Sequence, residues 1–465
     1  MTSASIDVLV AGAGAAGLAA ALSASDSDLD VVVVETSPSF RSSSNTAMST
    51  SMVPAAGSRW QSAAGIEDSP QQFYADIMSK TKGQADPVIA RALTNIAPEL
   101  VEWMADSVNV PFELVTDFRY PGHSVDRCLA VPDRSGATMH RHMLESVGHR
   151  STITLMNPMR LESIDIRSSG FITCVVEGPD HVRETVTTRS VVIATNGFAA
   201  HGDLVSQHLP EIEHALYHGG SESKGDSLVL GEQINADVAF LDSYQGHGSV
   251  AIPHGVIMTW AAVMQGAVLV NREGVRFGDE TVGYSEYAVP VLEQPGGFAW
   301  VVLDERINAA CSVFKDYRDL LNAGGIRWSA TVEGLASIVG AESEPLGSTL
   351  KTAASLACES TPDSFGRVFT TEPLTPPYGA VKVTGALFHT QGGLLVDGDA
   401  RVLSGGTPIN GVYAAGGAAA GISGHGASGY LAGNGLLSAL GLGYLAGRHV
   451  AQVHNPTIEI NRDEE

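Results

Sequence analysis

The stretch IDVLVAGAGAAGLAAAL, residues 6–22, decides the fold of this chain. The apolar run at 6–10 predicts a buried strand, and the alanines and leucines after the last glycine favour a helix. Between them, Gly12, Gly14 and Gly17 form the pattern G-x-G-x-x-G. A strand, a glycine turn and a helix in this order predict the opening of a doubly wound α/β domain.

The residues that follow support a dinucleotide site at this turn. The valines at 31–34 predict a second buried strand, and Glu35 comes directly after it, 18 residues beyond Gly17. The glycines allow backbone N–H groups to approach a pyrophosphate closely, and the helix N-terminus favours the anion. Glu35 can accept hydrogen bonds from ribose hydroxyls. The alternative, a strand-to-helix turn without a ligand, leaves the placement of the acidic residue unexplained.

Length, charge and cysteine usage exclude several classes of protein. The 465 residues predict two or three domains with a large core. A net charge of −24 repels nucleic acids and anionic membrane surfaces. The four cysteines contain no CxxC pair, so no metal site is expected. Without a signal-peptide pattern or a long apolar run, we expect a cytoplasmic protein with no membrane span.

The rest of the chain divides into segments of different pattern. Apolar residues at helical spacing predict an amphipathic helix over 86–108. Strand-like stretches at 153–156, 171–177 and 186–195 are expected to form an inserted antiparallel sheet that returns to the core sheet. From about 241 to 388 the pattern changes to short mixed segments with turn signals, which indicates a second domain.

Several motifs together resemble the flavoproteins of the fumarate reductase and succinate dehydrogenase type, which include the 3-ketosteroid dehydrogenases and tricarballylate dehydrogenase. The motifs are GAGAAG at 12–17, SSSNTAMSTS at 42–51, VVIATNGF at 191–198, KGDSLVLGEQINA at 224–236, VLVNREGVRF at 268–277, FHTQGG at 388–393 and GVYAAGGAAAGISGHGASGYLAGNG at 411–435. The resemblance implies an α/β fold with a Rossmann-like FAD-binding domain built from both chain ends, 1–241 and 389–465. An α+β capping domain, 242–388, would be inserted between them, with the active site at the junction.

The resemblance also implies where FAD binds and how. Covalent members of the family place a histidine near the flavin, whereas this chain has Ser43 and Ser44, so the FAD is expected to be non-covalent. Glycines before the last helix would bring backbone N–H groups toward the flavin, although they could also serve only close packing. The expected cofactor contacts are Gly12, Gly14, Ala15, Ala16, Gly17, Glu35, Thr36, Ser44, Asn45, Thr46, Thr195, Asn196, Gly197, Gly416, Gly417, Asn434, Gly435 and Leu436.

The chain departs from the fumarate reductases at the arginines that handle protons and the substrate carboxylate. The position of the proton-donating arginine carries Tyr284, and the position of the arginine that clamps the carboxylate carries Tyr430. Tyrosines at both positions resemble the ketosteroid dehydrogenases. The resemblance implies Tyr284 as the base that removes a proton next to a ketone and Tyr430 as the donor to its oxygen. Tyr120 is a weaker candidate for a helper.

Substrate contacts of the fumarate reductases are partly retained. His247, His389 and Thr259 match positions that bind a substrate carboxylate in that family, and Trp260 follows Thr259. One interpretation is a substrate with both a ketone and a carboxylate. The alternative is that both histidines are structural.

We therefore expect an FAD-dependent dehydrogenase that introduces a C=C bond α,β to a ketone, in a cyclic ketone or keto acid. The alternatives are a fumarate-reductase-like or tricarballylate-dehydrogenase-like enzyme acting on a carboxylic acid, and a flavin-binding module without turnover. Because the sequence has one dinucleotide motif, electrons are expected to pass to an external acceptor, oxygen or a carrier.

Overall fold

The computed structural model describes residues 4–359 and 361–455. Its first sheet contains β1 (Ala4–Ala11), β2 (Val31–Val34), β6 (Ile153–Met156), β7 (Arg160–Ile166), β8 (Ile172–Glu177), β9 (Arg183–Ile193), β19 (Arg401–Ser404) and β20 (Thr407–Ala414). The strand order is β19-β20-β9-β1-β2-β6, and β8 and β7 continue from β9. The strands from β20 to β6 run parallel, which is the core of the α/β fold predicted from the sequence.

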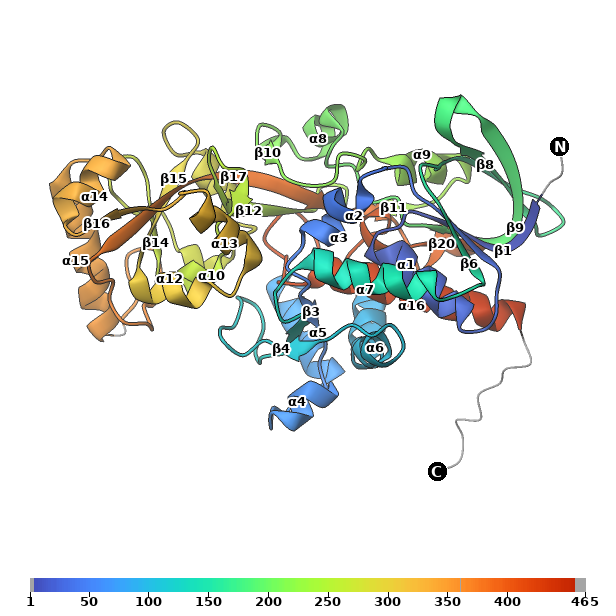
Figure 1. Cartoon of the computed structure of the whole chain (residues 1–465), viewed down its shortest axis with the longest axis horizontal. Coiled ribbons are helices and arrows are strands. Elements are labelled where there is room, and N and C mark those ends of the chain that lie inside the picture. The colour runs from blue at the N-terminus through green and yellow to red at the C-terminus, as the bar shows by residue number, and fades with distance from the viewer. Residues whose placement is uncertain (1–3, 360, 456–465) are drawn as a thin grey trace.

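Both ends of the chain build this sheet. Val192 of β9 pairs with Val10 of β1 on one side and with Tyr413 of β20 on the other. The first helix, α1 (Ala15–Ser25), lies against the last one, α16 (Asn434–His454) (Figure 1). The helices approach so closely that a Cβ at Gly443 would lie 2.3 Å from the Ala16 carbonyl oxygen. The prediction of one domain fold made from both chain ends is confirmed.

The structure corrects the expected position of one strand. β6 (Ile153–Met156) does not belong to an antiparallel insert but pairs in parallel with β2 at the edge of the first sheet. A parallel pair needs a crossover connection, and α7 (Gly136–Gly148) directly precedes β6 and supplies a helix for it. The expected antiparallel insert consists of β7, β8 and the start of β9.

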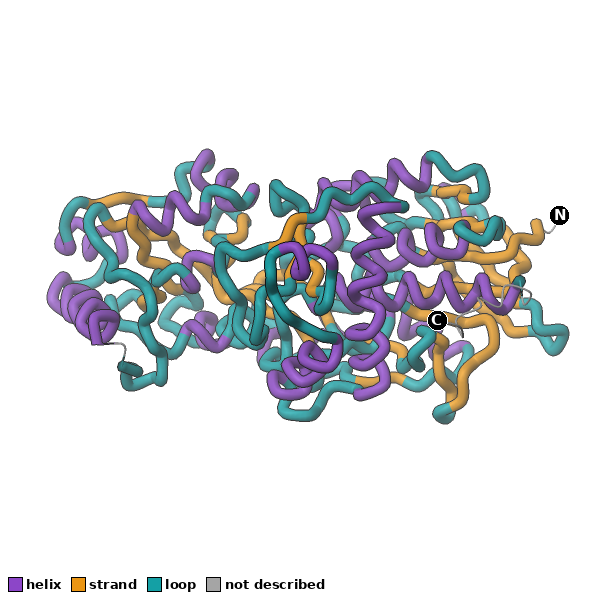
Figure 2. Tube along the Cα trace, turned by 90° about the horizontal axis from the view of Figure 1, so that it is seen from below, coloured by secondary structure: helices purple, strands orange, loops and turns teal. Residues whose placement is uncertain are grey.

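A second sheet lies at the other end of the elongated molecule (Figures 1 and 2). It contains β10 (Leu216–Tyr217), β12 (Tyr244–Ala251), β13 (Val256–Ile257), β14 (Val268–Val270), β15 (Ala299–Asp304), β16 (Arg327–Ser329) and β17 (Tyr378–Thr390). The order is β13-β12-β17-β15-β14, with β10 and β16 also paired to β17. This sheet therefore extends from residue 216 to residue 390, whereas the expected domain boundaries at 241/242 and 388/389 stay a prediction.

Helices and short strands complete the two halves. The remaining helices are α2 (Phe40–Ser43), α3 (Asn45–Met48), α4 (Arg59–Ala63), α5 (Pro70–Lys80), α6 (Pro87–Asp106), α8 (Gly202–His208), α9 (Asp226–Gln233), α10 (Ala261–Met264), α11 (Ala288–Leu292), α12 (Glu305–Cys311), α13 (Lys315–Asn322), α14 (Val332–Val339) and α15 (Ser343–Glu359). The short strands are β3 (Val53–Pro54), β4 (Glu113–Leu114), β5 (Cys128–Ala130), β11 (Val238–Ala239) and β18 (Gly393–Leu394). The predicted helix over 86–108 is α6, whose N-cap is Asp86.

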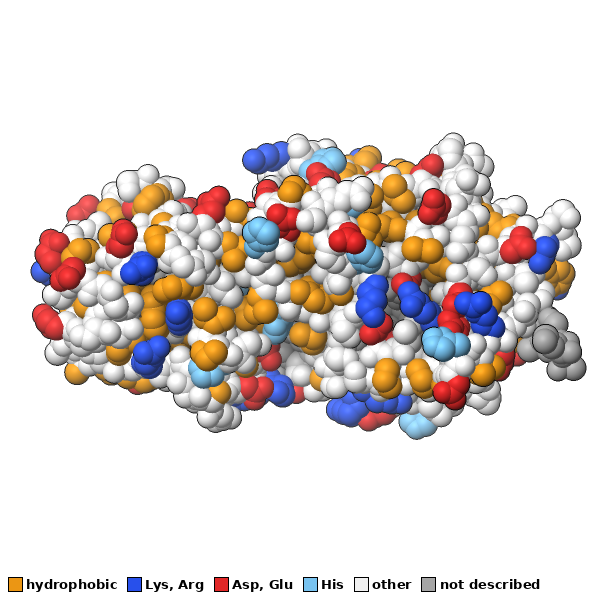
Figure 3. Space-filling view, turned by 90° about the horizontal axis from the view of Figure 1, so that it is seen from above, with side chains coloured by type: hydrophobic (Ala, Val, Ile, Leu, Met, Phe, Trp, Pro, Cys, Tyr) orange, Lys and Arg blue, Asp and Glu red, His pale blue; other side chains and the backbone are white. Residues whose placement is uncertain are grey.

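On the face shown in Figure 3, Lys and Arg side chains lie beside Asp and Glu. None of the helices within 4–359 and 361–455 is long and apolar enough to cross a membrane.

Candidate active site

The glycine turn after β1 is shaped by close backbone contacts. Gly12 has a φ of +112°, and a Cβ there would lie 2.2 Å from the Ala194 carbonyl oxygen. A Cβ at Gly17 would lie 1.8 Å from the Gly12 carbonyl oxygen. Any side chain at these positions would push the turn apart, so the glycines keep the N-terminus of α1 close to the sheet.

Glu35 lies at the end of β2, next to this turn. Its carboxylate accepts hydrogen bonds from the Ala13 N–H (2.8 Å) and the Ser37 N–H (2.7 Å), one on each oxygen. Burial raises the pKa of Glu35, and the two backbone N–H groups oppose this. Each oxygen keeps a second lone pair that can accept from a ribose hydroxyl.

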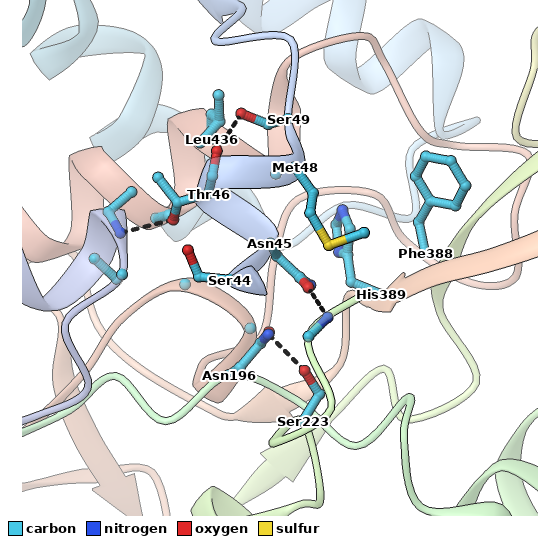
Figure 4. Close-up of a pocket in the computed structure, with 18 of the residues that line it drawn as sticks. Ser44, Asn45, Thr46, Met48, Ser49, Asn196, Ser223, Phe388, His389 and Leu436 are labelled. Atoms are coloured by element: carbon cyan, nitrogen blue, oxygen red, sulfur yellow. Dashed lines mark hydrogen bonds between the residues drawn. The ribbon is translucent and has the colours of Figure 1, made fainter. Parts of the chain in front are cut away.

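The segment that the sequence predicts to line the flavin is held in place by hydrogen bonds (Figure 4). The Thr46 hydroxyl accepts from the Ala15 N–H at 2.8 Å, which joins α3 to the start of α1. The Asn45 Oδ1 accepts from the Gly220 N–H at 2.6 Å. The Asn196 Nδ2 donates to the Ser223 hydroxyl at 2.7 Å. These bonds bring four distant segments of the chain around one space.

One continuous cavity joins the glycine turn to the candidate catalytic side chains. The predicted residues that line it are Gly12, Gly14, Ala15, Ala16, Glu35, Thr36, Ser44, Asn45, Thr46, Tyr120, Thr195, Asn196, His247, Thr259, Trp260, Tyr284, His389, Gly416, Gly417, Tyr430, Gly435 and Leu436. A dinucleotide at the glycine turn would therefore extend toward the tyrosines.

Three predicted cofactor residues are not in the wall of this cavity. Gly17 packs inside the turn. A Cβ at Gly197 would lie 1.9 Å from the Thr390 hydroxyl, so Gly197 lies against β17. Asn434 is fully buried at the start of α16, and its amide has no hydrogen-bond partner among the described residues. These residues support the wall from behind and are not at its surface.

Three tyrosines from separate segments lie together at the far end of the cavity. The rings of Tyr284 and Tyr430 are 5.9 Å apart, as are those of Tyr120 and Tyr284. The Gly435 N–H, in the first turn of α16, donates to the Tyr430 hydroxyl at 3.3 Å. The Tyr284 hydroxyl favours the anionic form of Tyr430, and the Thr259 hydroxyl that of Tyr120, so each lowers the pKa of its neighbour against the larger effect of burial.

These tyrosines are protonated at neutral pH because their surroundings disfavour a phenolate. Burial raises the pKa of Tyr284 well above its ordinary value, and the nearby Tyr430 and Tyr120 add to the rise. Burial also raises the pKa of Tyr430, but only to about 12, because the donors from Gly435 and Tyr284 stabilise its anion. A base at Tyr284 must therefore lose its own proton before it can accept one.

The two histidines are neutral. Burial lowers the pKa of His247 to about 3 and that of His389 to about 4. The Ser249 N–H donates to His247 Nδ1 at 3.3 Å, so the proton of this neutral ring is on Nε2. His389 Nδ1 lies 2.9 Å from the Gln391 amide nitrogen and 3.3 Å from the Thr390 carbonyl oxygen. Both histidines can therefore form hydrogen bonds without a positive charge.

The histidines differ in their surroundings. His247 is stacked between the rings of Tyr284 and Phe388, each 5.0 Å away. His389 lies near the hydrogen bond that joins Gly435 to Tyr430, since a Cβ on Gly435 would be 2.9 Å from His389 Nε2 and 3.2 Å from the Tyr430 hydroxyl. His389 therefore shares one end of the cavity with Tyr430, while His247 packs along the side of Tyr284.

Charged groups hold the loop that carries Tyr284. Glu280, fully buried, accepts from Arg276 (2.6 Å) and Arg367 (2.9 Å). After Tyr284, Glu286 pairs with Lys80 of α5, and Lys80 also donates to the Val282 carbonyl at 2.9 Å. These pairs fix the loop on both sides of Tyr284, and one of them ties it to the half that contains the first sheet.

FAD fits the residues at the cavity wall. The start of α1 faces the cavity through Gly14 and Ala15, and Glu35 is placed for a ribose. The Thr195 hydroxyl lines the cavity and is buried without a hydrogen-bond partner among the described residues. A polar ligand would satisfy it.

Sequence reasoning missed several residues of the wall. His218, Ser221, Glu222 and Ser223 come directly before the KGDS motif, so extending that motif toward the N-terminus would have found them. Arg134 also lines the cavity, but it belongs to no motif, and nothing in the sequence indicated it.

Comparisons with known proteins show the family of the chain. The model of the FAD binding domain family matches residues 7–436. The chain is 27% identical over 427 residues to the probable fumarate reductase Ifc3 of Shewanella frigidimarina, covering 88% of this chain and 69% of that protein. It is 27% identical over 327 residues to 4-oxocyclohex-2-ene-1-carboxylate 5-dehydrogenase of Sinomonas cyclohexanicum, covering 61% of this chain and 54% of that protein.

A solved structure supports the fold. The 3-ketosteroid-Δ4-(5α)-dehydrogenase of Rhodococcus jostii RHA1 superimposes with a TM-score of 0.74 at 23% identity, over 96% of this chain and 97% of that one. The family match covers the glycine turn, both sheets and the start of α16. The chain belongs to the FAD binding domain family and is an FAD-dependent oxidoreductase.

Proposed function

We propose that this enzyme is a dehydrogenase that introduces a C=C bond α,β to a ketone, in a cyclic ketone or keto acid. The observation that carries the proposal is the cluster of Tyr120, Tyr284 and Tyr430, in the same cavity as the residues for FAD. The relationship to the Sinomonas enzyme, whose name describes a ring ketone bearing a carboxylate, supports it.

Tyr430 and Gly435 form the end that receives the ketone. The Tyr430 hydroxyl and the Gly435 N–H are 3.3 Å apart, so both can donate to one carbonyl oxygen. Gly435 lies in the first turn of α16, where the helix dipole favours negative charge. These donors stabilise the oxygen as it becomes an enolate, and the neutral His389 can add a third hydrogen bond.

Tyr284 is the base in this proposal. It takes a proton from the carbon next to the carbonyl, while FAD, when bound, supplies the acceptor for the hydride from the neighbouring carbon. The substrate thus loses one proton and one hydride and gains a double bond. Because burial raises the pKa of Tyr284, only its deprotonated form can take this proton, so its own proton must first be released to solvent. Tyr120, in ring contact with Tyr284, helps to hold the base in position.

The second candidate is an oxidoreductase acting on a simple carboxylic acid, which the identity with the probable fumarate reductase supports. Against it, the positions expected to carry arginine have Tyr284 and Tyr430. A phenol lacks the permanent charge with which a guanidinium clamps a carboxylate. The ketone reaction therefore suits these side chains better.

We further propose that FAD is held non-covalently, because the expected position has Ser43 and Ser44 and no histidine, and that its electrons leave to oxygen or a carrier. In this proposal, the half with the first sheet holds FAD, and the half with the second sheet covers the substrate. Acid precipitation should leave the yellow colour in the supernatant, and colour in the pellet would contradict non-covalent binding.

The experiment that tests the function compares three substrates without oxygen. Holoenzyme is mixed with 4-methylcyclohexanone, the matching alcohol or succinate, and the visible flavin absorbance and the products by mass spectrometry are followed. Only the ketone should bleach the flavin and give an unsaturated product. Comparable bleaching by succinate would favour the carboxylic-acid candidate, and no bleaching by any of them would count against the ketone proposal.

A further inference from the structure

Arg134 is a charged side chain in the cavity wall with an unused donor. Its side chain is 12% exposed and lines the cavity together with the three tyrosines. Its Nη2 donates to Asp117 at 3.1 Å, but its Nη1 is buried and has no hydrogen-bond partner among the described residues. Buried polar groups are nearly always hydrogen-bonded in folded proteins. Burial without a partner costs more free energy for a charged group than for a neutral one.

The backbone holds Arg134 firmly in this place. Arg134 has a φ of +53°, an uncommon conformation for a residue with a side chain. Its N–H donates to the Val131 carbonyl at 2.9 Å, and the Gly136 N–H donates to the Ser49 carbonyl at 2.7 Å. The turn is thereby tied to the segment that lines the FAD site. A rigid turn aims a side chain more precisely than a mobile loop.

No other group in the described cavity wall accepts a hydrogen bond from Arg134 Nη1, and no second buried cation lies there. The cavity-lining Lys and Arg residues in the described part of the chain are Arg134 and Lys315, and Lys315 is 53% exposed and paired with Asp319 at 2.5 Å. Asp316 also lines the cavity, but the charges that act on it are those of Lys315 and Asp319. Of these two cations, Arg134 is the one with a buried donor that lacks a partner, although its charge is paired with that of Asp117.

Arg134 lies near Tyr120 of the tyrosine cluster. Its charge lowers the pKa of Tyr120 and of Cys128, against the larger effect of burial. Tyr120 contacts Tyr284, and Tyr284 contacts Tyr430. The ring contacts therefore connect the cation at Arg134 to the ketone end at Tyr430 through the proposed base.

Resting on the proposed function, we propose that Arg134 binds a carboxylate of the substrate, so that the enzyme prefers cyclic keto acids to neutral cyclic ketones. The buried Nη1 is the donor, and the ketone lies at Tyr430 while the acid group lies at Arg134. The neutral His247 and His389 then need not carry the carboxylate. A ring with its oxygen and its carboxylate on opposite carbons, as in the name of the Sinomonas relative, meets this arrangement.

The test uses inert ligands so that binding is measured without turnover. 4-Hydroxybenzoate carries a phenol oxygen opposite a carboxylate, and 4-hydroxybenzamide is its neutral match. Both are titrated calorimetrically into the FAD-loaded enzyme. Wild type should bind the acid about 10- to 100-fold more tightly than the amide, as expected for a charge-assisted hydrogen bond in a buried site.

Three variants test whether Arg134 causes this preference for the acid. Arg134→Gln should abolish it by weakening the acid alone, and Arg134→Lys should restore part of it through its charge. Lys315→Gln, which removes the other cation of the wall, should leave it unchanged. FAD content and melting temperature check that each variant is folded, and the lysine variant keeps the test valid if the glutamine variant does not fold.

Two results would overturn the proposal: a wild type that fails to prefer the acid, or an Arg134→Gln variant that keeps the preference. Failure of the ketone chemistry is a separate outcome. If no cyclic ketone is oxidised but the acid preference is present and lost in Arg134→Gln, the proposed reaction is wrong and the carboxylate site stands. If 4-methylcyclohexanone is oxidised equally by wild type and Arg134→Gln without an acid preference, the reaction stands and the site does not.

Discussion

Replacing Tyr284 by Phe removes the proposed base and little else. The ring contacts with His247 at 5.0 Å and with Tyr120 and Tyr430 at 5.9 Å are retained, so the cavity keeps its shape. The lost hydroxyl interacts with that of Tyr430, so its removal should cost at most about 1 kcal/mol of stability. Loss of general-base catalysis costs about 10²- to 10⁴-fold in rate, or about 3–5 kcal/mol of barrier. We therefore expect an FAD-loaded, folded enzyme that reduces its flavin far more slowly.

Tyr287→Phe is a matched control for this variant. Tyr287 is three residues further along the same loop, its hydroxyl is buried without a hydrogen-bond partner among the described residues, and it does not line the cavity. Removing that hydroxyl should leave the rate unchanged. Anaerobic stopped-flow mixing with 4-methylcyclohexanone measures both rates. If Tyr284→Phe retains more than about a tenth of the wild-type rate, or if Tyr287→Phe loses as much, the assignment of the base is refuted.

Three further predictions follow from the same contacts. Glu35→Ala should raise the Kd for FAD about 10- to 100-fold in a fluorescence titration of the apoprotein, and an unchanged Kd would remove the ribose role. Since the raised pKa of Tyr284 keeps it protonated, kcat/KM for a ketone should rise about tenfold per pH unit between about pH 6.5 and 9, with steady-state rates as the measure. A flat profile would exclude phenolate as the base. Gly435→Ala places a methyl group 2.9 Å from His389 Nε2 and 3.2 Å from the Tyr430 hydroxyl. The KM for ketones should therefore increase at least about tenfold, with the FAD content unchanged. An unchanged KM would mean that the ketone binds elsewhere.

The pH prediction has a defined range because burial of tyrosines affects stability as well. A folded-state pKa above the unfolded value of about 10 means that the stabilisation is complete below about pH 10 and is lost as the pH rises further. Rates should therefore be compared below that limit. The histidines add no inflection there, because burial lowers the pKa of His247 to about 3 and of His389 to about 4.

Local pattern was enough to determine the first unit of the fold. The valine run predicted at 31–34 is β2, and the helix predicted after the glycine turn is α1, which begins at Ala15. Strand, turn and helix here depend on neighbours within a few residues, and only glycine tolerates the close contact of residue 17 with the Gly12 carbonyl. The family's motif positions also named Tyr284 and Tyr430, because these motifs are readable along the chain, and Tyr120 was a weaker candidate on a loop.

Only the tertiary structure decided the partners of β6, the cation in the cavity wall and the protonation of the site. The pairing of β6 with β2 joins segments more than a hundred residues apart. Nothing in the sequence of 153–156 indicates which sheet edge this strand will join. Arg134 reaches the cavity because its turn, which has a positive φ, packs against the segment around Ser49. That segment is close in space but distant in the sequence. The pKa values of Tyr284 and His389 are set by burial among side chains from distant segments. Burial is a property of the assembled fold. The sequence could therefore propose Tyr284 and His389 as site residues but could not give their protonation states.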